Sequence, residues 1–326
     1  MSDVVLRTID PNERDAVLDL LAEWYNDREF FARYLLHDPT FTPDLCFVAE
    51  VEGKLISTFQ VFRKQIRLDS AVLDVAGVGN VFTTPAYRGR SIASRLLEFG
   101  IAQLPRHGFD VSLLFAVRIA FYARLGYRSH LRYLFYFPPS GPCREIPRYN
   151  LRPFTASDLP AVQQIYDGYS SRFRGPTLRN PAYWAGQLRY AGNPSERFLV
   201  AEQNGEVVAY ARATNLWDFY VVSEYGCRAG HLESLVALLL QHQAEGSQNY
   251  PGMLVQLAHD PALLQQLEQH GLVGSRIDDV FWMWRVVSPE QFAAKLGVTT
   301  AALQRMELWQ ELFPPESTVY WISDRF

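Results

Sequence analysis

Two short patterns from the start of the chain return in the same order in its second half. The residues Leu-Arg and Ala-Val at positions 6–17 return at positions 151–162, a shift of 145 residues. The pattern Phe-Val-Ala-Glu-x-x-Gly at positions 47–53 returns as Leu-Val-Ala-Glu-x-x-Gly at positions 199–205, a shift of 152 residues. Ordered returns at nearly constant spacing indicate an internal duplication. The 326 residues are therefore predicted to form two copies of one domain and a short extension.

The stretch from Val78 to Leu104 predicts a strand, a basic loop and a helix. Valine and phenylalanine favour the strand, and Pro85 ends it because proline has no N–H to donate to a neighbouring strand. After the loop Arg88-Gly89-Arg90, apolar residues recur at spacings of three and four, which is one face of an amphipathic helix. Unpaired N–H groups and the helix dipole make such a helix start suited to a phosphate. The alternative is a surface turn before an ordinary helix.

A second motif, Phe121-Tyr122-Ala123-Arg124-Leu125-Gly126-Tyr127, follows an apolar run at 111–117 that predicts a buried strand. Together with the run Arg88-Gly89-Arg90-Ser91-Ile92-Ala93, it resembles the GNAT superfamily of acetyl-CoA-dependent N-acyltransferases. The pyrophosphate signature of that family is Arg/Gln-x-x-Gly-x-Gly/Ala, and here Ser91 stands where glycine is usual. A serine at that place can still present its amide, but its Cβ narrows the approach of a ligand.

The resemblance implies an α+β (mixed α/β) fold with two tandem GNAT domains, each a mostly antiparallel central sheet flanked by helices. We expect a catalytic domain that binds acetyl-CoA at residues 1–140 and a second GNAT-like domain at residues 141–287. Residues 288–326 are expected to form a helical extension and a docked terminal strand. The boundary between the two domains falls in a proline-rich run at 138–147, which is typical of a linker.

The second copy is predicted to be degenerate, and so to be structural or half of the acceptor site, because it differs from the first where the chemistry is expected. The second copy has Cys-Arg-Ala-Gly at 227–230 in place of the Arg-Gly-Arg loop, and Gln265 in place of Tyr122. The layout of the chain resembles the Eis type of tandem acetyltransferase, in which the terminal carboxylate reaches the active site. N-myristoyltransferases, which are also tandem GNAT proteins, use their terminal carboxylate as the base.

The resemblance assigns residues to each part of the reaction. Nine residues are expected to bind acetyl-CoA: Val81, Phe82, Thr83, Arg88, Gly89, Arg90, Ser91, Ile92 and Ala93. Tyr122 would act as the acid that protonates the leaving thiolate, and its alternative role is a packed aromatic side chain. The Phe326 carboxylate would act as the base, and its alternative is a terminal charge that faces water. Asp324 is the competing carboxylate. If the Phe326 carboxylate is the base, the substitution Asp324→Asn should have only a mild effect on activity.

The acceptor pocket is expected near the N-terminal helices. Residues 14–34 have helical spacing with a bend near Asn26-Asp27. By resemblance, this region walls the acceptor site, so Trp24 and Asp27 are expected to contact the substrate. Their alternatives are a core aromatic residue and a helix cap. Further along, the pattern predicts a strand at 66–72, a helix at 299–312 and an extended, docked end at 318–326.

Composition narrows the classes of function. The net charge of −4 and the lack of a long Lys/Arg tract argue against a nucleic-acid partner. No run approaches the roughly 18 apolar residues of a membrane-spanning helix, and no signal peptide is recognisable; we therefore expect a cytoplasmic protein without a membrane partner. The three cysteines are widely spaced, which favours neither a metal site nor a disulfide. The sequence gives no sign of the oligomeric state.

These expectations favour an enzyme. Its partners would be acetyl-CoA, as a co-substrate, and a primary amine of a small molecule or peptide. The amine would attack directly, through a tetrahedral intermediate, without a metal. The alternative function is a non-catalytic acyl-CoA-binding or regulatory protein that kept the GNAT fold. Retention of Arg88 and Tyr122 favours the enzyme.

Overall fold

The computed structural model describes residues 3–25, 27–139, 146, 148–190, 196–216, 218–246, 248–257, 260–305 and 307–326. Most of the predicted linker, with Cys143, lies outside these residues. The described helices include none that is long and apolar enough to cross a membrane.

The elements of the first half follow the chain in this order: β1 (Val5–Thr8), α1 (Arg14–Tyr25), α2 (Arg28–His37), η1 (Pro43–Leu45), β2 (Cys46–Val51), β3 (Lys54–Leu68), β4 (Ala71–Thr83), η2 (Pro85–Tyr87), α3 (Ile92–Ile101), η3 (Leu104–His107), β5 (Val111–Phe115), α4 (Ile119–Ala123) and β6 (Arg128–Phe137). The second half repeats the pattern: β7 (Asn150–Pro153), η4 (Ala156–Asp158), α5 (Leu159–Ser170), α6 (Pro181–Tyr190), β8 (Arg197–Gln203), β9 (Glu206–Leu216), β10 (Phe219–Cys227), α7 (Leu232–Gly246), β11 (Met253–Val255), α8 (Pro261–Gln269) and β12 (Ser275–Val286). The extension adds α9 (Pro289–Leu296), η5 (Thr300–Gln304), α10 (Leu308–Leu312) and η6 (Ile322–Asp324).

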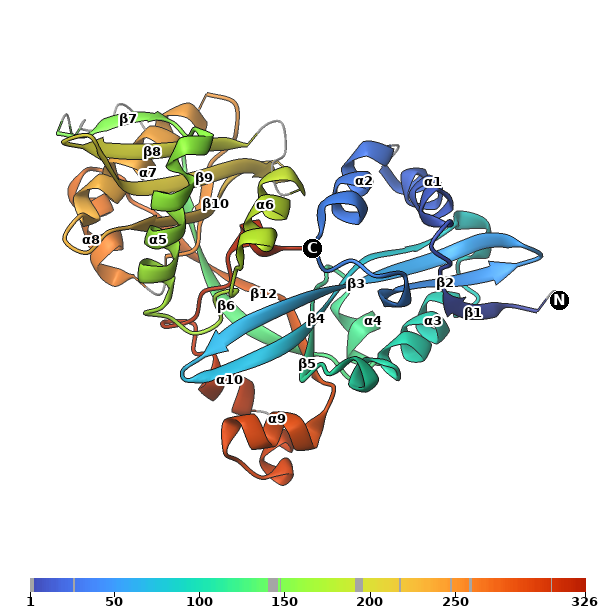
Figure 1. Ribbon diagram of the computed structural model, residues 1–326. Helices are drawn as coiled ribbons and strands as arrows, with labels where there is room; N and C mark the ends of the chain where they lie inside the picture. Colours follow the sequence, from blue (N-terminus) through green and yellow to red (C-terminus); the bar gives the residue numbers. More distant parts are fainter. Residues whose placement is uncertain are drawn as a thin grey trace.

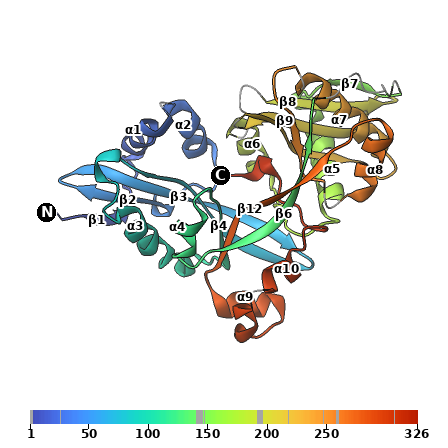
Figure 2. The same ribbon diagram turned by 180° about the vertical axis from the view of Figure 1, so that it is seen from behind.

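The strands form one twelve-stranded sheet in the order β1-β2-β3-β4-β5-β12-β6-β11-β10-β9-β8-β7. Its pairs are antiparallel except for β4–β5 and β10–β11, which are parallel. Helices flank the sheet in two lobes (Figures 1 and 2). The predicted mixed α/β fold with two similar halves is confirmed.

The two halves exchange their last strands. β6 belongs to the first half by sequence, but it pairs with β11 of the second half and with β12. β12 ends the second half and pairs with β5 of the first. Figures 1 and 2 show β6 and β12 crossing between the lobes. This exchange joins the lobes through backbone hydrogen bonds, which a sequence comparison of the two copies does not reveal.

An ion cluster occurs at the same place in both halves. Arg7 and Arg152 lie on the first strand of their respective halves, and each binds two carboxylates at 2.6–3.0 Å. The carboxylates are Glu13 and Glu50 in the first half and Asp158 and Glu202 in the second. The sequence shifts between these pairs are again 145 and 152 residues. The duplication inferred from the sequence therefore extends to the contacts.

Two expected elements differ from the structure, and the docked terminal strand is present as an extended segment. The strand expected at 66–72 is absent, because β3 continues to Leu68 and a turn then leads into β4. The helix expected at 299–312 is broken into η5 and α10. The chain end is extended around the short turn η6, and its only described β contact is an isolated bridge from Thr318 to Arg174. These differences follow from tertiary packing, which decides where a short apolar run bends.

The extension packs through aromatic side chains. Trp284 on β12 stacks on Trp309 and Phe313 at ring-centroid distances of 5.3 and 5.1 Å. Trp282 contacts Tyr320 edge to face at 4.6 Å. All five side chains are buried. Burial of an aromatic side chain contributes about 1.5–3 kcal/mol, so the extension is an integral part of the fold.

Candidate active site

A cavity of about 620 Å³ lies where β4 and β5 separate. The two strands pair only as far as Gly77 and Leu113. Beyond that point β4 carries one extra residue relative to β3 between Gly79 and Phe82, and Asn80 there has a φ of 53°. Such a bulge leaves backbone groups unpaired in the sheet. The separated strands therefore offer main-chain donors and acceptors beside a cavity.

Eight of the nine residues expected to bind the cofactor line this cavity. They are Val81, Phe82, Thr83, Arg88, Gly89, Ser91, Ile92 and Ala93. The ninth, Arg90, is exposed outside the lining, with its guanidinium 5.2 Å from the centre of the Tyr87 ring. The structure thus brings the loop and the strand together as the sequence predicted.

The loop geometry explains the residue types before α3. Gly89 and Ser91 both have left-handed backbones, with φ of 76° and 58°. A glycine adopts this conformation freely, whereas a serine is strained in it. Arg88 is exposed and its Nε donates to the Thr83 carbonyl at 2.9 Å. The unpaired N–H groups of the first turn of α3 lie beside it, which is the arrangement of a phosphate site.

Tyr122 lies on α4 at the other side of the cavity. The following Gly126 has a φ of 82°, and the N–H groups of Leu125 and Tyr127 both bond the Tyr122 carbonyl. This left-handed turn ends the helix and accounts for the glycine of the motif. Burial raises the pKa of Tyr122 to about 12. The hydroxyl is therefore protonated near neutral pH and able to donate.

A second cavity, of about 370 Å³, lies between the lobes. Its lining comes from α2, β4, the second half and the chain end. Among its residues are Arg33, Tyr34, Asn80, Glu196, Thr214, Asn215, Ser223, Arg325 and Phe326. Both cavities are lined by Trp24, Val81, Phe115 and Tyr122. They therefore meet beside Tyr122.

The C-terminus reaches this junction. The Phe326 ring stacks on Phe62 at 5.6 Å and lies so close to Gly77 that a Cβ there would be 2.5 Å from the ring. A Cβ on Gly79 would lie 3.0 Å from the terminal carbon of Phe326 and 3.2 Å from its oxygen. The terminal carboxylate is therefore held against β4, beside the bulge. In Figures 1 and 2 the chain end lies between the lobes.

The two residues expected to contact the acceptor have different places. Trp24 lines both cavities and stacks on Phe82 at 6.1 Å. Asp27 is exposed, lines neither cavity and caps α2, because its carboxylate accepts from the Phe30 N–H at 2.9 Å. The structure therefore brings Trp24 to the junction and leaves Asp27 in the capping role that the sequence analysis held as the alternative.

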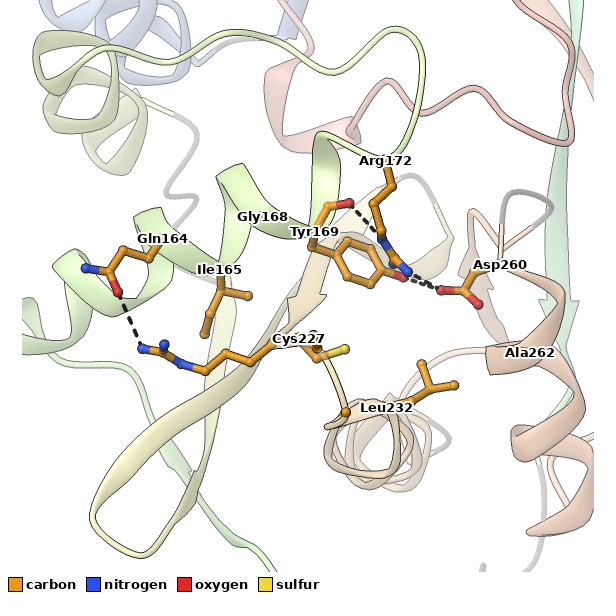
Figure 3. Close-up of a pocket in the computed structure, with 12 residues that line it drawn as sticks. Gln164, Ile165, Gly168, Tyr169, Arg172, Cys227, Leu232, Asp260 and Ala262 are labelled. Atoms are coloured by element: carbon orange, nitrogen blue, oxygen red, sulfur yellow. Dashed lines mark hydrogen bonds and ion pairs between the residues drawn. The ribbon is translucent and has the colours of Figure 1, made fainter.

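The second half has a cavity of about 570 Å³ at the position that corresponds to the cofactor cavity (Figure 3). Cys227 and Arg228 precede α7 there, and Arg228 donates to the Val207 carbonyl and to the Gln164 side chain. Arg172 lies near Asp260. Burial raises the pKa of Cys227 to about 12, so its thiol is protonated and a poor nucleophile. Among the described residues, Gln265, which takes the place of Tyr122 in the second copy, does not line this cavity.

Sequence reasoning did not identify the residues that the second half contributes to the 370 Å³ cavity. Glu196, Thr214, Asn215 and Ser223 come from around β8, β9 and β10 and carry no motif. Their only signal was the duplication itself, which suggested that the second copy forms part of the acceptor site. Within the described residues, no group of three or more His, Cys, Asp or Glu side chains could hold a metal ion.

Residues 5–129 match the family model described as an acetyltransferase (GNAT) domain. No curated protein sequence matches the chain. Solved structures share the fold over most of the chain. A probable N-acyltransferase from Enterococcus faecalis has a TM-score of 0.67 and 14% identity over 90% of this chain and 75% of its own.

Two further solved structures share this fold and carry the names of specific proteins. Eis1 from Mycobacterium abscessus has a TM-score of 0.57 and 16% identity, with 90% of this chain and 76% of its own covered. N-myristoyltransferase from Saccharomyces cerevisiae, with bound myristoyl-CoA, has a TM-score of 0.60 and 13% identity, with 87% and 83% covered. At sequence identities this low, the structural similarity establishes the shared fold alone.

Proposed function

We propose that this acyltransferase, whose residues 5–129 form a GNAT acetyltransferase domain, moves an acetyl group from acetyl-CoA to a primary amine of a small molecule or peptide. The observation that carries the proposal is the meeting of two cavities beside Tyr122. One cavity is lined by the loop at Arg88 and Gly89, and the other is lined by Phe326. A transferase needs both substrates to reach one point.

The first half would hold the cofactor. Arg88 and the start of α3 would bind the pyrophosphate, since bonds from arginine to phosphate are charge-assisted. The unpaired backbone beside Asn80 and Val81 would align the pantetheine arm and donate to the thioester oxygen as negative charge develops there. The fold binds acyl-CoA in a relative with bound myristoyl-CoA. Acetyl, rather than a longer acyl group, is part of the proposal.

The proton transfers would take place at the junction of the cavities. The Phe326 carboxylate would accept the proton that the amine loses, because an ammonium with a pKa near about 10.4 cannot attack. The amine nitrogen then bonds to the thioester carbon, the C–S bond breaks and the sulfur takes the electron pair. Tyr122 would donate a proton to that sulfur, and the second proton that the nitrogen loses as the intermediate becomes the amide would restore Tyr122. We also propose a division of the chain into a catalytic domain at residues 1–140, a degenerate copy at residues 141–287 and a docked extension at residues 288–326.

Thiol release from acetyl-CoA with a panel of primary amines tests the activity directly. We expect release that depends on an amine and that falls sharply in Tyr122→Phe, with acetyl-CoA affinity unchanged. Tyr136→Phe is the matched control, because its hydroxyl bonds the Pro251 carbonyl outside both cavities. Tight acetyl-CoA binding without release on any amine would instead favour the non-catalytic function. Longer acyl-CoA substrates in the same assay would establish the acyl group.

The role of the terminal carboxylate can be separated from that of its side chain. One extra glycine after Phe326 moves the carboxylate, and we expect it to lower kcat by about 10²–10⁴-fold, the usual worth of a general base. Phe326→Ala keeps the carboxylate and should cost much less. Both variants should bind acetyl-CoA normally. Full activity in the extended protein would exclude the carboxylate as the base.

A further inference from the structure

The last residues of the chain pass through a buried ion cluster before they reach the active site. Arg179 and Asp324 have no solvent exposure in their side chains and are 2.9 Å apart. Arg179 also binds Glu224 of β10 at 2.5 Å, and Glu224 is equally buried. Arg212 completes the cluster, with Glu196 at 2.8 Å. Asp324 is thus a paired structural group and not a second base.

The four fully buried charges of the cluster balance, because Arg179 and Arg212 face Asp324 and Glu224. Burial alone would raise the pKa of Glu224, yet Arg179 and Arg212 lower it to about 2. Burial likewise opposes the charge on Arg179, and Asp324 and Glu224 raise its pKa far above the ordinary value. An isolated charge at this depth would be costly. The pairing with Arg179 therefore favours the buried position of Asp324.

Hydrogen bonds extend the cluster across both lobes. The Tyr183 hydroxyl on α6 donates to Asp324 at 2.9 Å, and Lys64 on β3 donates to Tyr183 at 2.6 Å. Ser323, the neighbour of Asp324 in the tail, donates to Glu224. Lys64 belongs to the first half, and Tyr183 and Glu224 belong to the second. The position of Asp324 is therefore set from both sides of the cleft.

Few bonds separate this anchor from the terminal carboxylate. The Arg325 N–H bonds the Ile322 carbonyl at 3.1 Å, and Tyr320 donates to the Asp324 carbonyl at 3.2 Å. Phe326 then follows with a Cα–Cα step of about 3.8 Å per residue. Beyond Asp324, the Phe326 ring packs against Phe62 and Phe115, each at a centroid distance of 5.6 Å. A shift of Asp324 would therefore be transmitted to the carboxylate.

We propose that the Arg179–Asp324 ion pair, with Tyr183, is a positioning device that holds the Phe326 carboxylate at the reaction centre. The inference rests on the proposed function of that carboxylate. This inference gives the degenerate second half a role, since that half supplies Arg179, Tyr183 and Glu224. Effects near 10²-fold follow from a displacement of about 1 Å of a reacting group. This reverses the mild effect of Asp324→Asn that the sequence suggested.

The experiment is a double-mutant cycle in the full-length chain, with an N-terminal tag. Asp324→Asn removes the charge but leaves Arg179 paired with Glu224. We expect it to lower kcat by about 10–100-fold with the acetyl-CoA Kd unchanged. The same substitution in the chain with one extra glycine after Phe326 should have no further effect on kcat. A purely structural role would lower the activity equally in both backgrounds, which would overturn the proposal.

A milder variant guards against a loss of folding. Tyr183→Phe removes the hydroxyl that donates to Asp324 and accepts from Lys64, and it leaves the pairs of Arg179 with Asp324 and Glu224 in place; we expect a kcat several-fold lower and the same non-additivity. Tyr169→Phe is the matched control, because that buried hydroxyl bonds Asp260 in the same half at 2.7 Å, away from the tail. Unchanged kcat in both Asp324→Asn and Tyr183→Phe would overturn the inference alone. An extended chain with full activity would instead overturn the proposed base.

Discussion

Arg88 is the residue through which the expected phosphate site can be tested most simply. Its side chain is exposed, and its described hydrogen bond is to a carbonyl of the adjacent strand, so the fold does not depend on it. We expect Arg88→Ala to raise the acetyl-CoA Kd about 10–100-fold, because hydrogen bonds to charged groups contribute about 1.5–3 kcal/mol. Isothermal titration measures this change.

Arg95 provides the control for that measurement. It is also exposed, one turn further along α3, but it does not line the cofactor cavity. Arg95→Ala should leave the Kd within about twofold, apart from a small long-range effect of charge that salt suppresses. Equal losses in the two variants would mean that net charge, and not the loop, attracts the cofactor.

At the scale of elements, β4 and the chain end are packed so closely that a single added methyl group would test their contact. A methyl group at Gly77 would overlap the Phe326 ring, at 2.5–2.7 Å from three of its atoms. Gly77→Ala should therefore displace the last residue and lower kcat about 10–100-fold, with cofactor affinity retained. Steady-state kinetics on the purified variant would test this expectation.

Removal of the ring should relieve that clash. In Gly77→Ala/Phe326→Ala the added methyl group meets no ring, so its kcat should match that of Phe326→Ala alone. Gly168→Ala is a neutral control, because a Cβ there meets nothing within 4 Å. If the double variant were as impaired as Gly77→Ala, the effect of Gly77 would not pass through Phe326.

At the scale of the whole molecule, the duplication predicts two cavities but one cofactor. The first half has Arg88 and Tyr122 around its cavity, whereas the second has a protonated Cys227 and arginines directed to Gln164 and Asp260. Calorimetric titration with acetyl-CoA should therefore give one site per chain. A stoichiometry of two would show that the second half is not degenerate.

Buried histidines predict how the stability of the whole molecule depends on pH. Burial lowers the pKa of His130 and of His242 to about 4, from an ordinary 6.5. The unfolded chain therefore binds more protons between these values, so stability is complete above about pH 6.5 and is lost as the pH falls toward 4. Each histidine should cost about 2 kcal/mol between pH 7 and 5. In His130→Leu, the free energy of unfolding measured by chemical denaturation should fall less between pH 7 and 5 than in the unsubstituted protein. An unchanged dependence of that free energy on pH would contradict the assignment.

The sequence by itself determined the features that depend on local spacing. The 145- and 152-residue shifts identified the duplication, and it returned as matching strands and ion pairs around Arg7 and Arg152. The Arg88 loop before an amphipathic helix was found because helix periodicity and proline are readable within a few residues. The glycine at Gly126 is likewise a local requirement, since its backbone is left-handed.

Only the tertiary structure decided which distant segments meet. The exchange of β6 and β12, the four residues shared by the cavities and the burial of Asp324 against Arg179 all join positions far apart in the chain. The division at residues 140 and 141 remains a prediction, and it cuts between strands that pair across it. An apolar or charged residue requires burial or an opposite charge, but its place in the sequence does not say which distant residue provides it. Many partners would therefore satisfy the same sequence pattern. The packing of the complete chain selects one of them, and with it the place of the terminal carboxylate.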